Sequence, residues 1–114
     1  MKIVKMQGAQ GDMYFRKIEE LPEELELVEP QNGKYVLAHS ETGHHHITLE
    51  RPTVKLFKGM DVLRSFLVVE EEPAELIHLR KTHTHETQAL TPGIWEIIRQ
   101  REFDLMEGWR FAAD

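Results

Sequence analysis

Three consecutive histidines open a segment that is typical of a β-strand, His44 to Glu50. Side chains alternate between the two faces of a strand, so this segment has one polar face and one mainly apolar face. The polar face carries His44, His46, Thr48 and Glu50. Imidazole and carboxylate groups are ligands of divalent metals, and imidazole also transfers protons near neutral pH. This segment is therefore the first candidate for a site that performs chemistry.

A second histidine cluster repeats the His-x-His spacing later in the chain, at His83-Thr84-His85-Glu86. A His-x-His pair on a strand places two imidazoles about 7 Å apart at Cα, so one ion can be held when another strand supplies a third ligand. Because the chain contains no cysteine, histidine and carboxylate are the side-chain ligands that matter. We predict that a divalent metal ion (zinc, iron or manganese) is bound by His44, His46, His83 and His85.

A metal site of this kind would support hydrolysis, because a bound metal lowers the pKa of its water to about 7. The first interpretation is therefore a metal-dependent hydrolase that acts on a small, phosphate-containing anion, with Glu50 and Glu86 as candidate catalytic carboxylates. The alternative for each histidine is a structural role, in which it hydrogen-bonds threonines or the backbone. His78 is expected to be structural, and His45 lies on the apolar face of its strand.

Two arginines continue the face of a tryptophan and an isoleucine in the last long strand pattern, Gly93 to Phe103. This face carries Trp95, Ile97, Arg99, Arg101 and Phe103. Such a strand leaves the core and enters a polar pocket, where planar guanidinium groups bind phosphate or carboxylate. We predict that Arg99 and Arg101, with His39 at the rim of a neighbouring hairpin, bind an anionic substrate. Alternatively, both arginines pair with surface acids, where each pair contributes little to stability.

The length and charge of the chain limit the class of protein. At 114 residues with 40% hydrophobic residues, residues 1–114 are expected to form a single domain with a real core. The net charge of −6 disfavours binding of duplex nucleic acid over a broad surface. The first residues are too charged for a secretory signal, and no apolar run approaches membrane-spanning length. We expect a cytoplasmic protein with no membrane contact, and a homodimer remains open.

Short apolar runs separated by glycine and proline turns predict the elements that position these residues. The expected strands are 2–6, 13–18, 34–40, 44–50, 53–58, 62–70, 74–79 and 93–103. Gln7 to Asp12 contains two glycines and is interpreted as a turn or bulge, and Pro30 to Gly33 and Thr91 to Gly93 as turns. The run from Phe66 to Val69 predicts a strand buried on both faces.

One segment, Glu19 to Val28, carries Pro22 and several acids near its start and is expected to form a short helix. The alternative is an alternating strand from Leu25. Many short strands and little helix indicate a mainly all-β fold, a small antiparallel β-barrel or sandwich with at most one short helix.

The histidine segment resembles the first motif of the cupin barrels, in which two histidines in a His-x-His pair are followed after three residues by a glutamate. Here that pattern is Gly43-His44-His45-His46 followed by Glu50. The resemblance implies that His44, His46 and Glu50 are metal ligands. The chain departs from the pattern because its glycines are displaced and the second cupin motif is absent.

A second resemblance covers more of the chain. The segments Leu37 to His46, Gly11 to Tyr14 and Arg99 to Asp104 are similar to a small uncharacterised family of bacterial and phage genomes. This resemblance implies one coherent domain, located in the host cytoplasm if the protein is encoded by a phage. It points to no particular activity and leaves the chemistry open.

Two other functions remain open. His46-Ile47-Thr48 resembles the His-x-Thr element of two-histidine phosphoesterases, with His85-Glu86-Thr87 as a second copy, which implies a metal-free phosphodiesterase. The other alternative is a non-enzymatic ligand-binding or assembly protein, of phage origin.

Overall fold

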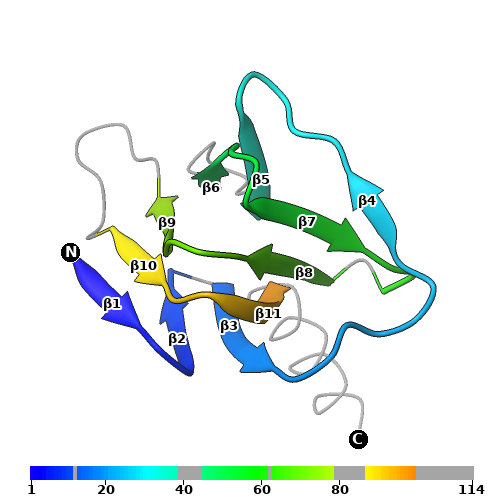
Figure 1. Ribbon diagram of the computed structural model, residues 1–114, viewed down its shortest axis with the longest axis horizontal. Helices are drawn as coiled ribbons and strands as arrows, with labels where there is room; N and C mark the ends of the chain where they lie inside the picture. Colours follow the sequence, from blue (N-terminus) through cyan, green and yellow to red (C-terminus); the bar gives the residue numbers. More distant parts are fainter. Residues whose placement is uncertain (12, 39–44, 62, 79–86, 100–114) are drawn as a thin grey trace, which may run out of the picture.

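The computed structural model describes residues 1–11, 13–38, 45–61, 63–78 and 87–99. All regular secondary structure in these ranges is β-strand, as Figure 1 shows. The strands are β1 Lys2–Val4, β2 Gln7–Gln10, β3 Met13–Ile18, β4 Glu26–Val28, β5 Lys34–Ala38, β6 His46–Leu49, β7 Val54–Lys58, β8 Arg64–Val69, β9 Ala74–His78, β10 Gln88–Leu90 and β11 Gly93–Arg99. The predicted all-β fold is confirmed.

Two sheets form a sandwich rather than a closed barrel. The five-stranded sheet has the order β1-β10-β9-β6-β5, and the six-stranded sheet has the order β2-β3-β11-β8-β7-β4. All pairings are antiparallel except that between β1 and β10, which is parallel. In Figure 1 the chain passes directly from β1 to β2, and so from one sheet into the other.

The hydrophobic core lies between the two sheets, because both contribute buried side chains to one cluster. The five-stranded sheet supplies Val4, Tyr35, Leu37, Ala38, Ala74, Leu76 and Leu90. The six-stranded sheet supplies Met13, Phe15, Val54, Leu56, Leu67, Val69, Trp95 and Ile97. In β8, Phe66 on the outer face is buried as well as Leu67 and Val69 on the core face. The predicted burial on both faces is therefore confirmed at Phe66 and Leu67, whereas Val68 on the outer face is half-buried and Arg64 is exposed.

The turn predicted for Gln7 to Asp12 is wrong over most of its length. Gln7–Gln10 is strand β2, which pairs antiparallel with β3, and Gly8 lies opposite Phe15. An added β-carbon on Gly8 would lie 2.7 Å from Cε2 of Phe15, so the glycine makes room for a buried ring rather than for a turn. The predicted strand 2–6 is correspondingly shorter, because β1 ends at Val4.

The short helix predicted for Glu19 to Val28 is not formed. Glu24 has a φ of 60°, which lies outside the right-handed helical region and interrupts any helix there. The chain instead forms β4, in which Leu27 lies opposite Phe57 of β7. The alternative interpretation, a strand in the second half of this segment, is the one that the structure confirms.

The turn predicted at Pro30 to Gly33 is confirmed. Asn32 and Gly33 have positive φ values of 54° and 76°, as the Asn-Gly pair of a tight turn requires. The next strand, β5, pairs with β6, and a register shift between Val36 and Ala38 brings Ala38 opposite His46. His46 is the first residue of β6, so it lies at the end of its strand, beside this irregularity.

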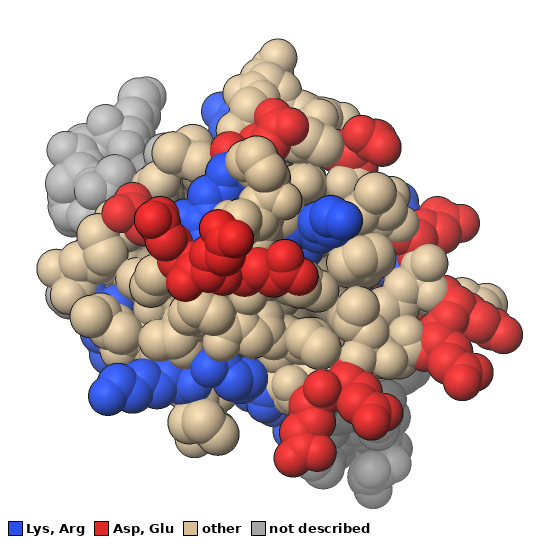
Figure 2. Space-filling model, viewed as in Figure 1, with Lys and Arg blue, Asp and Glu red and all other residues tan. Residues whose placement is uncertain are grey.

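Charged groups of both signs cover the visible face of the molecule. Figure 2 shows a band of Asp and Glu side chains across the middle of this face, with Lys and Arg side chains above and below the band. Within the described ranges, no helix is long and apolar enough to cross a membrane.

Candidate functional site

Two buried histidines, one from each of two neighbouring strands, lie side by side at one end of the five-stranded sheet. His46 of β6 and His78 of β9 are direct partners in the antiparallel pairing. Their rings stack with centroids 4.0 Å apart and planes 12° apart. Only 1% of His46 and 5% of His78 is exposed, so both imidazoles belong to the interior of the sandwich. His78, expected to be structural, forms the surface on which His46 packs.

The side chain of Gln10 fixes which ring nitrogen of His46 carries its proton. Nε2 of Gln10 donates a hydrogen bond to the carbonyl oxygen of Leu76 at 3.0 Å, which orients the amide. Oε1 of Gln10 therefore faces Nδ1 of His46, at 3.0 Å. Because an amide oxygen only accepts, Nδ1 is the donor, and the neutral imidazole has its lone pair on Nε2. Metal-ligating histidines are commonly held in this way, through a hydrogen bond from the other ring nitrogen.

The turn after β2 packs against the edges of both rings. Gly11 has a φ of +60°, and an added β-carbon there would lie 3.0 Å from Cε1 of His46 and 3.4 Å from Cε1 of His78. Glycine is suited to this position by both its backbone angle and its lack of a side chain. The same β-carbon would lie 3.2 Å from Nε2 of His46, so a side chain at this position would crowd that nitrogen.

Further polar side chains gather where the ends of the two sheets meet. Gln10 lies opposite Met13, and Met13 lies opposite Arg99, so these three residues form one row across the six-stranded sheet. Arg99 is on the same strand face as the buried Trp95 and Ile97, at the rim of the core. We define the polar end as Gln10, His46, His78, Gln88 and Arg99.

Gln88 contributes a buried acceptor to the polar end. It lies opposite Leu76, it is 8% exposed, and its Nε2 donates to the carbonyl oxygen of Ala9 at 2.8 Å. Its Oε1 accepts no hydrogen bond from the described residues. A buried amide oxygen of this kind is suited to accept a hydrogen bond from a bound water or ligand.

Of the four predicted metal ligands, the structure describes His46. His44, His83 and His85 lie outside the described residues, as do the other predicted site residues Glu86, Arg101 and His39. Within the described part of the chain, no three His, Asp or Glu side chains converge as a metal site requires. The strand ends that flank both histidine clusters do meet at the polar end. Ala38 lies opposite His46, His46 lies opposite His78, and β10 begins at Gln88.

The predicted catalytic residue Glu50 is not at the polar end. It follows the last residue of β6, four positions from His46, which corresponds to about 13 Å along an extended strand. Its backbone N–H donates to the carbonyl oxygen of Gly33 at 2.8 Å. Glu50 instead lines a separate cavity of about 400 Å³ with Tyr35, Arg51 and Val54. The structure therefore does not bring Glu50 together with His46.

Tyr35, which lines this cavity with Glu50, is expected to lower the stability of the folded protein at alkaline pH. Burial, followed by the negative charges of Glu50 and Glu29, raises the pKa of the Tyr35 phenol above its usual value of 10.0. Since ionisation is harder in the folded state, the stabilisation is complete below pH 10 and is lost as the pH rises through the folded-state pKa. Denaturant unfolding at pH 8 to 11 is expected to show a steeper alkaline loss for the wild type than for Tyr35→Phe. Identical pH profiles would contradict this assignment.

Gln10 was not among the predicted site residues, and no local pattern in the sequence identifies it. His78 could have been found, because it continues the alternation of Ala74 and Leu76 on one strand face, and both of these residues are buried.

Comparison with known proteins gives one match. A family described as "Domain of unknown function (DUF8820)" matches residues 9–100 of the chain. No curated protein and no solved structure matches the chain.

Proposed function

Because the chain belongs to that family of unknown function, we propose its function from the polar end alone. The match is consistent with the expected membership of an uncharacterised family. We propose that the protein binds one divalent metal ion, with zinc, manganese and iron as candidates, and that Nε2 of His46 is a ligand. The remaining ligands are proposed to come from His44, His83 and His85. The observation that carries this proposal is the fixed tautomer of His46 in a buried position.

The stacked arrangement assigns different roles to the two buried histidines. A metal ion lies in the plane of an imidazole, about 2.0–2.1 Å from the nitrogen. Two rings stacked 4.0 Å apart and nearly parallel cannot both direct a lone pair at the same ion. In our proposal His46 is therefore the ligand, and His78 holds its ring in place.

A hydrolytic role extends this proposal. A bound divalent ion would supply a nucleophilic water, because it lowers the pKa of that water to about 7. In this proposal Arg99, half-buried at the end of β11, orients a phosphate-containing substrate through its guanidinium group. Glu50 is omitted from this role because it lies near the opposite end of β6 from His46.

The test is the metal content of the purified protein. Tag-free wild type is expected to contain close to one equivalent of metal by elemental analysis. His46→Phe keeps a planar ring for stacking but removes Nε2, so it is expected to lose the metal. His78→Phe is the matched control, with the same substitution at the neighbouring buried position, and is expected to retain it. Circular dichroism establishes that both variants are folded.

Other results would favour the alternatives. A wild type that takes up no metal after dialysis against zinc, manganese or iron would rule out the proposal. Cleavage of a phosphodiester that survives chelation would instead support the metal-free phosphodiesterase. A metal-free protein that self-associates without any hydrolytic activity would support the assembly protein.

A further inference from the structure

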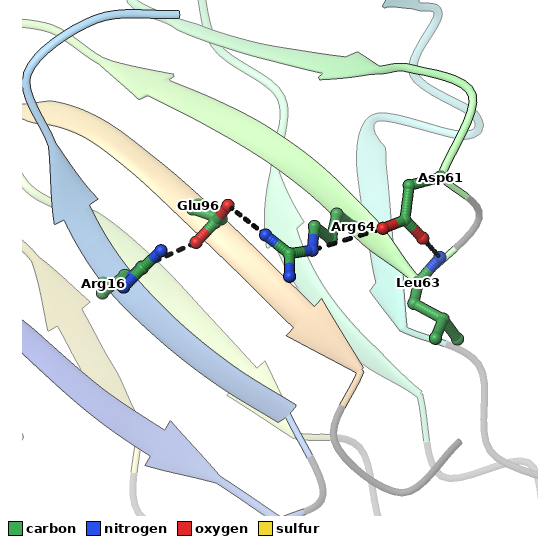
Figure 3. Close-up of polar contacts among 5 residues, drawn as sticks. All are labelled: Arg16, Asp61, Leu63, Arg64 and Glu96. Atoms are coloured by element: carbon green, nitrogen blue, oxygen red, sulfur yellow. Dashed lines mark hydrogen bonds and ion pairs between the residues drawn. The ribbon is translucent and has the colours of Figure 1, made fainter. Parts of the chain in front are cut away.

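A buried glutamate lies between two arginines on the outer face of the six-stranded sheet. Glu96 of the central strand β11 is 6% exposed, although its side chain points away from the core. Its Oε1 accepts a hydrogen bond from Nε of Arg16 at 2.6 Å, and its Oε2 accepts one from Nη1 of Arg64 at 3.0 Å. Figure 3 shows these three side chains in one row, with Asp61 beyond Arg64.

The contacts with Glu96 use only part of the hydrogen-bonding capacity of the two arginines. A guanidinium group has five N–H donors. Arg16 uses Nε, and Arg64 uses Nη1 for Glu96 and Nε for Asp61, which lies 3.3 Å away. Within the described residues, neither terminal nitrogen of Arg16, nor Nη2 of Arg64, has a partner. The side chains remain 58% and 42% exposed, so these donors are accessible to a ligand.

The two arginines line a groove next to this row. The groove has a volume of about 640 Å³ and is lined by Gln7, Gly8, Ala9, Tyr14, Phe15, Arg16, Arg64 and Ile98. This volume is within the range of about 300–1,000 Å³ that is usual for small-molecule sites. The charged lining residues are the two arginines, and Tyr14 and Ile98 add aromatic and aliphatic surface.

Charge and shape together indicate the class of ligand. Two positive charges face the groove, and the one negative charge between them, Glu96, is covered by the arginine side chains. Asp61 contacts Arg64 and is not part of the groove lining. A guanidinium pair with spare donors binds planar or tetrahedral oxyanions. An apolar body attached to that oxyanion would contact the neighbouring ring and aliphatic side chain.

We propose that this groove binds a small organic oxyanion, a carboxylate or phosphate attached to an aromatic or aliphatic body. The oxyanion accepts hydrogen bonds from the terminal nitrogens of Arg16 and Arg64, and the body packs on Tyr14 and Ile98. The groove lies on the outer face of the sheet, whereas His46 is buried on the core side. The two sites are therefore independent.

Titration calorimetry with phenyl phosphate, benzoate and inorganic phosphate tests this proposal. Arg16→Gln is expected to weaken the binding of phenyl phosphate or benzoate by roughly tenfold or more, the size of one charge-assisted hydrogen bond. Lys55→Gln is the matched control, because it removes the same charge from an exposed position on the outer face but outside this groove. The affinity of Lys55→Gln for phenyl phosphate or benzoate is expected to stay within about twofold of that of the wild type. Ala9→Trp fills the groove, keeps both arginines and is expected to abolish binding.

The remaining results separate this groove from the proposed metal site and identify the oxyanion. His46→Phe is expected to leave binding in the groove unchanged, whether or not the protein binds metal. Tighter binding of phenyl phosphate than of benzoate assigns the groove to phosphates, and the reverse order assigns it to carboxylates. Three results would overturn the proposal: no binding of either aromatic probe, equal weakening by Lys55→Gln, or inorganic phosphate bound as tightly as phenyl phosphate.

Discussion

Adding the cognate metal to metal-free protein is expected to raise the melting temperature by about 10 °C. A ligand that binds only the folded state at 100 times its dissociation constant stabilises it by about 2.7 kcal/mol. For a chain of 114 residues, 1 kcal/mol corresponds to a shift of about 4 °C. The effect is large because the proposed ligand His46 is buried and its ring is held by Gln10 and His78. Scanning calorimetry with and without a chelator measures the shift.

The two phenylalanine variants determine whether this stabilisation depends on the polar end. His46→Phe is expected to melt at the same temperature with and without metal. His78→Phe starts from a lower melting temperature, because the ring contact changes, but keeps the metal-dependent rise. A rise of equal size in His46→Phe would assign the stabilisation to other histidines. No rise in the wild type with zinc, manganese or iron would contradict the proposed site.

Replacing Trp95 by alanine is expected to lower the free energy of unfolding by about 3–5 kcal/mol. Trp95 is completely buried in the central strand of the six-stranded sheet. Its ring makes an edge-to-face contact with Phe15 at 6.2 Å, and its Nε1 donates to the carbonyl oxygen of Thr91 at 2.8 Å. The substitution therefore leaves a large cavity and an unpaired carbonyl oxygen. Denaturant unfolding followed by circular dichroism measures the loss.

Two controls identify the cause of this loss. Trp95→Phe keeps an aromatic ring next to Phe15 but removes Nε1, and it is expected to lose less than Trp95→Ala. Leu49→Ala removes a large apolar side chain that is 55% exposed, and its effect is expected to stay within about 0.5 kcal/mol. Equal losses for Trp95→Ala and Leu49→Ala would show that the core is not packed around Trp95.

The strands and turns that local chemistry determines could be predicted from the sequence. The apolar run around Leu67 and the Asn32-Gly33 turn each depend on residues next to one another in the chain. The turn predicted around Gly8 was wrong, because this glycine is required by the ring of Phe15 on the neighbouring strand and not by a turn. The helix predicted around Glu24 was also wrong, because the positive φ of this residue interrupts a segment whose composition suits a helix.

The candidate site could be predicted only in part, for a related reason. Strand alternation correctly placed His46 and Thr48 on one face. It could not show that this face points into the core between the sheets, because that depends on where the second sheet packs. The partner of His46, Gln10, comes from a strand 36 residues away in the sequence. Arg16 and Glu96 are separated by 80 residues, so no motif contains both.

The pairing of β3 with β11 determines when the protein can fold. These adjacent strands of the larger sheet come from opposite parts of the chain, and β1 likewise cannot pair until β10 has been made. Closing such long loops costs entropy before any contact compensates for it, so all-β domains of this kind fold in milliseconds to seconds. During synthesis β3 leaves the ribosome long before its partner. The apolar segment from Phe66 to Val69 also lacks one neighbour until β11 arrives. During this interval the chain is most exposed to pairing with another copy of itself, so a low protein concentration is the suitable condition for its refolding.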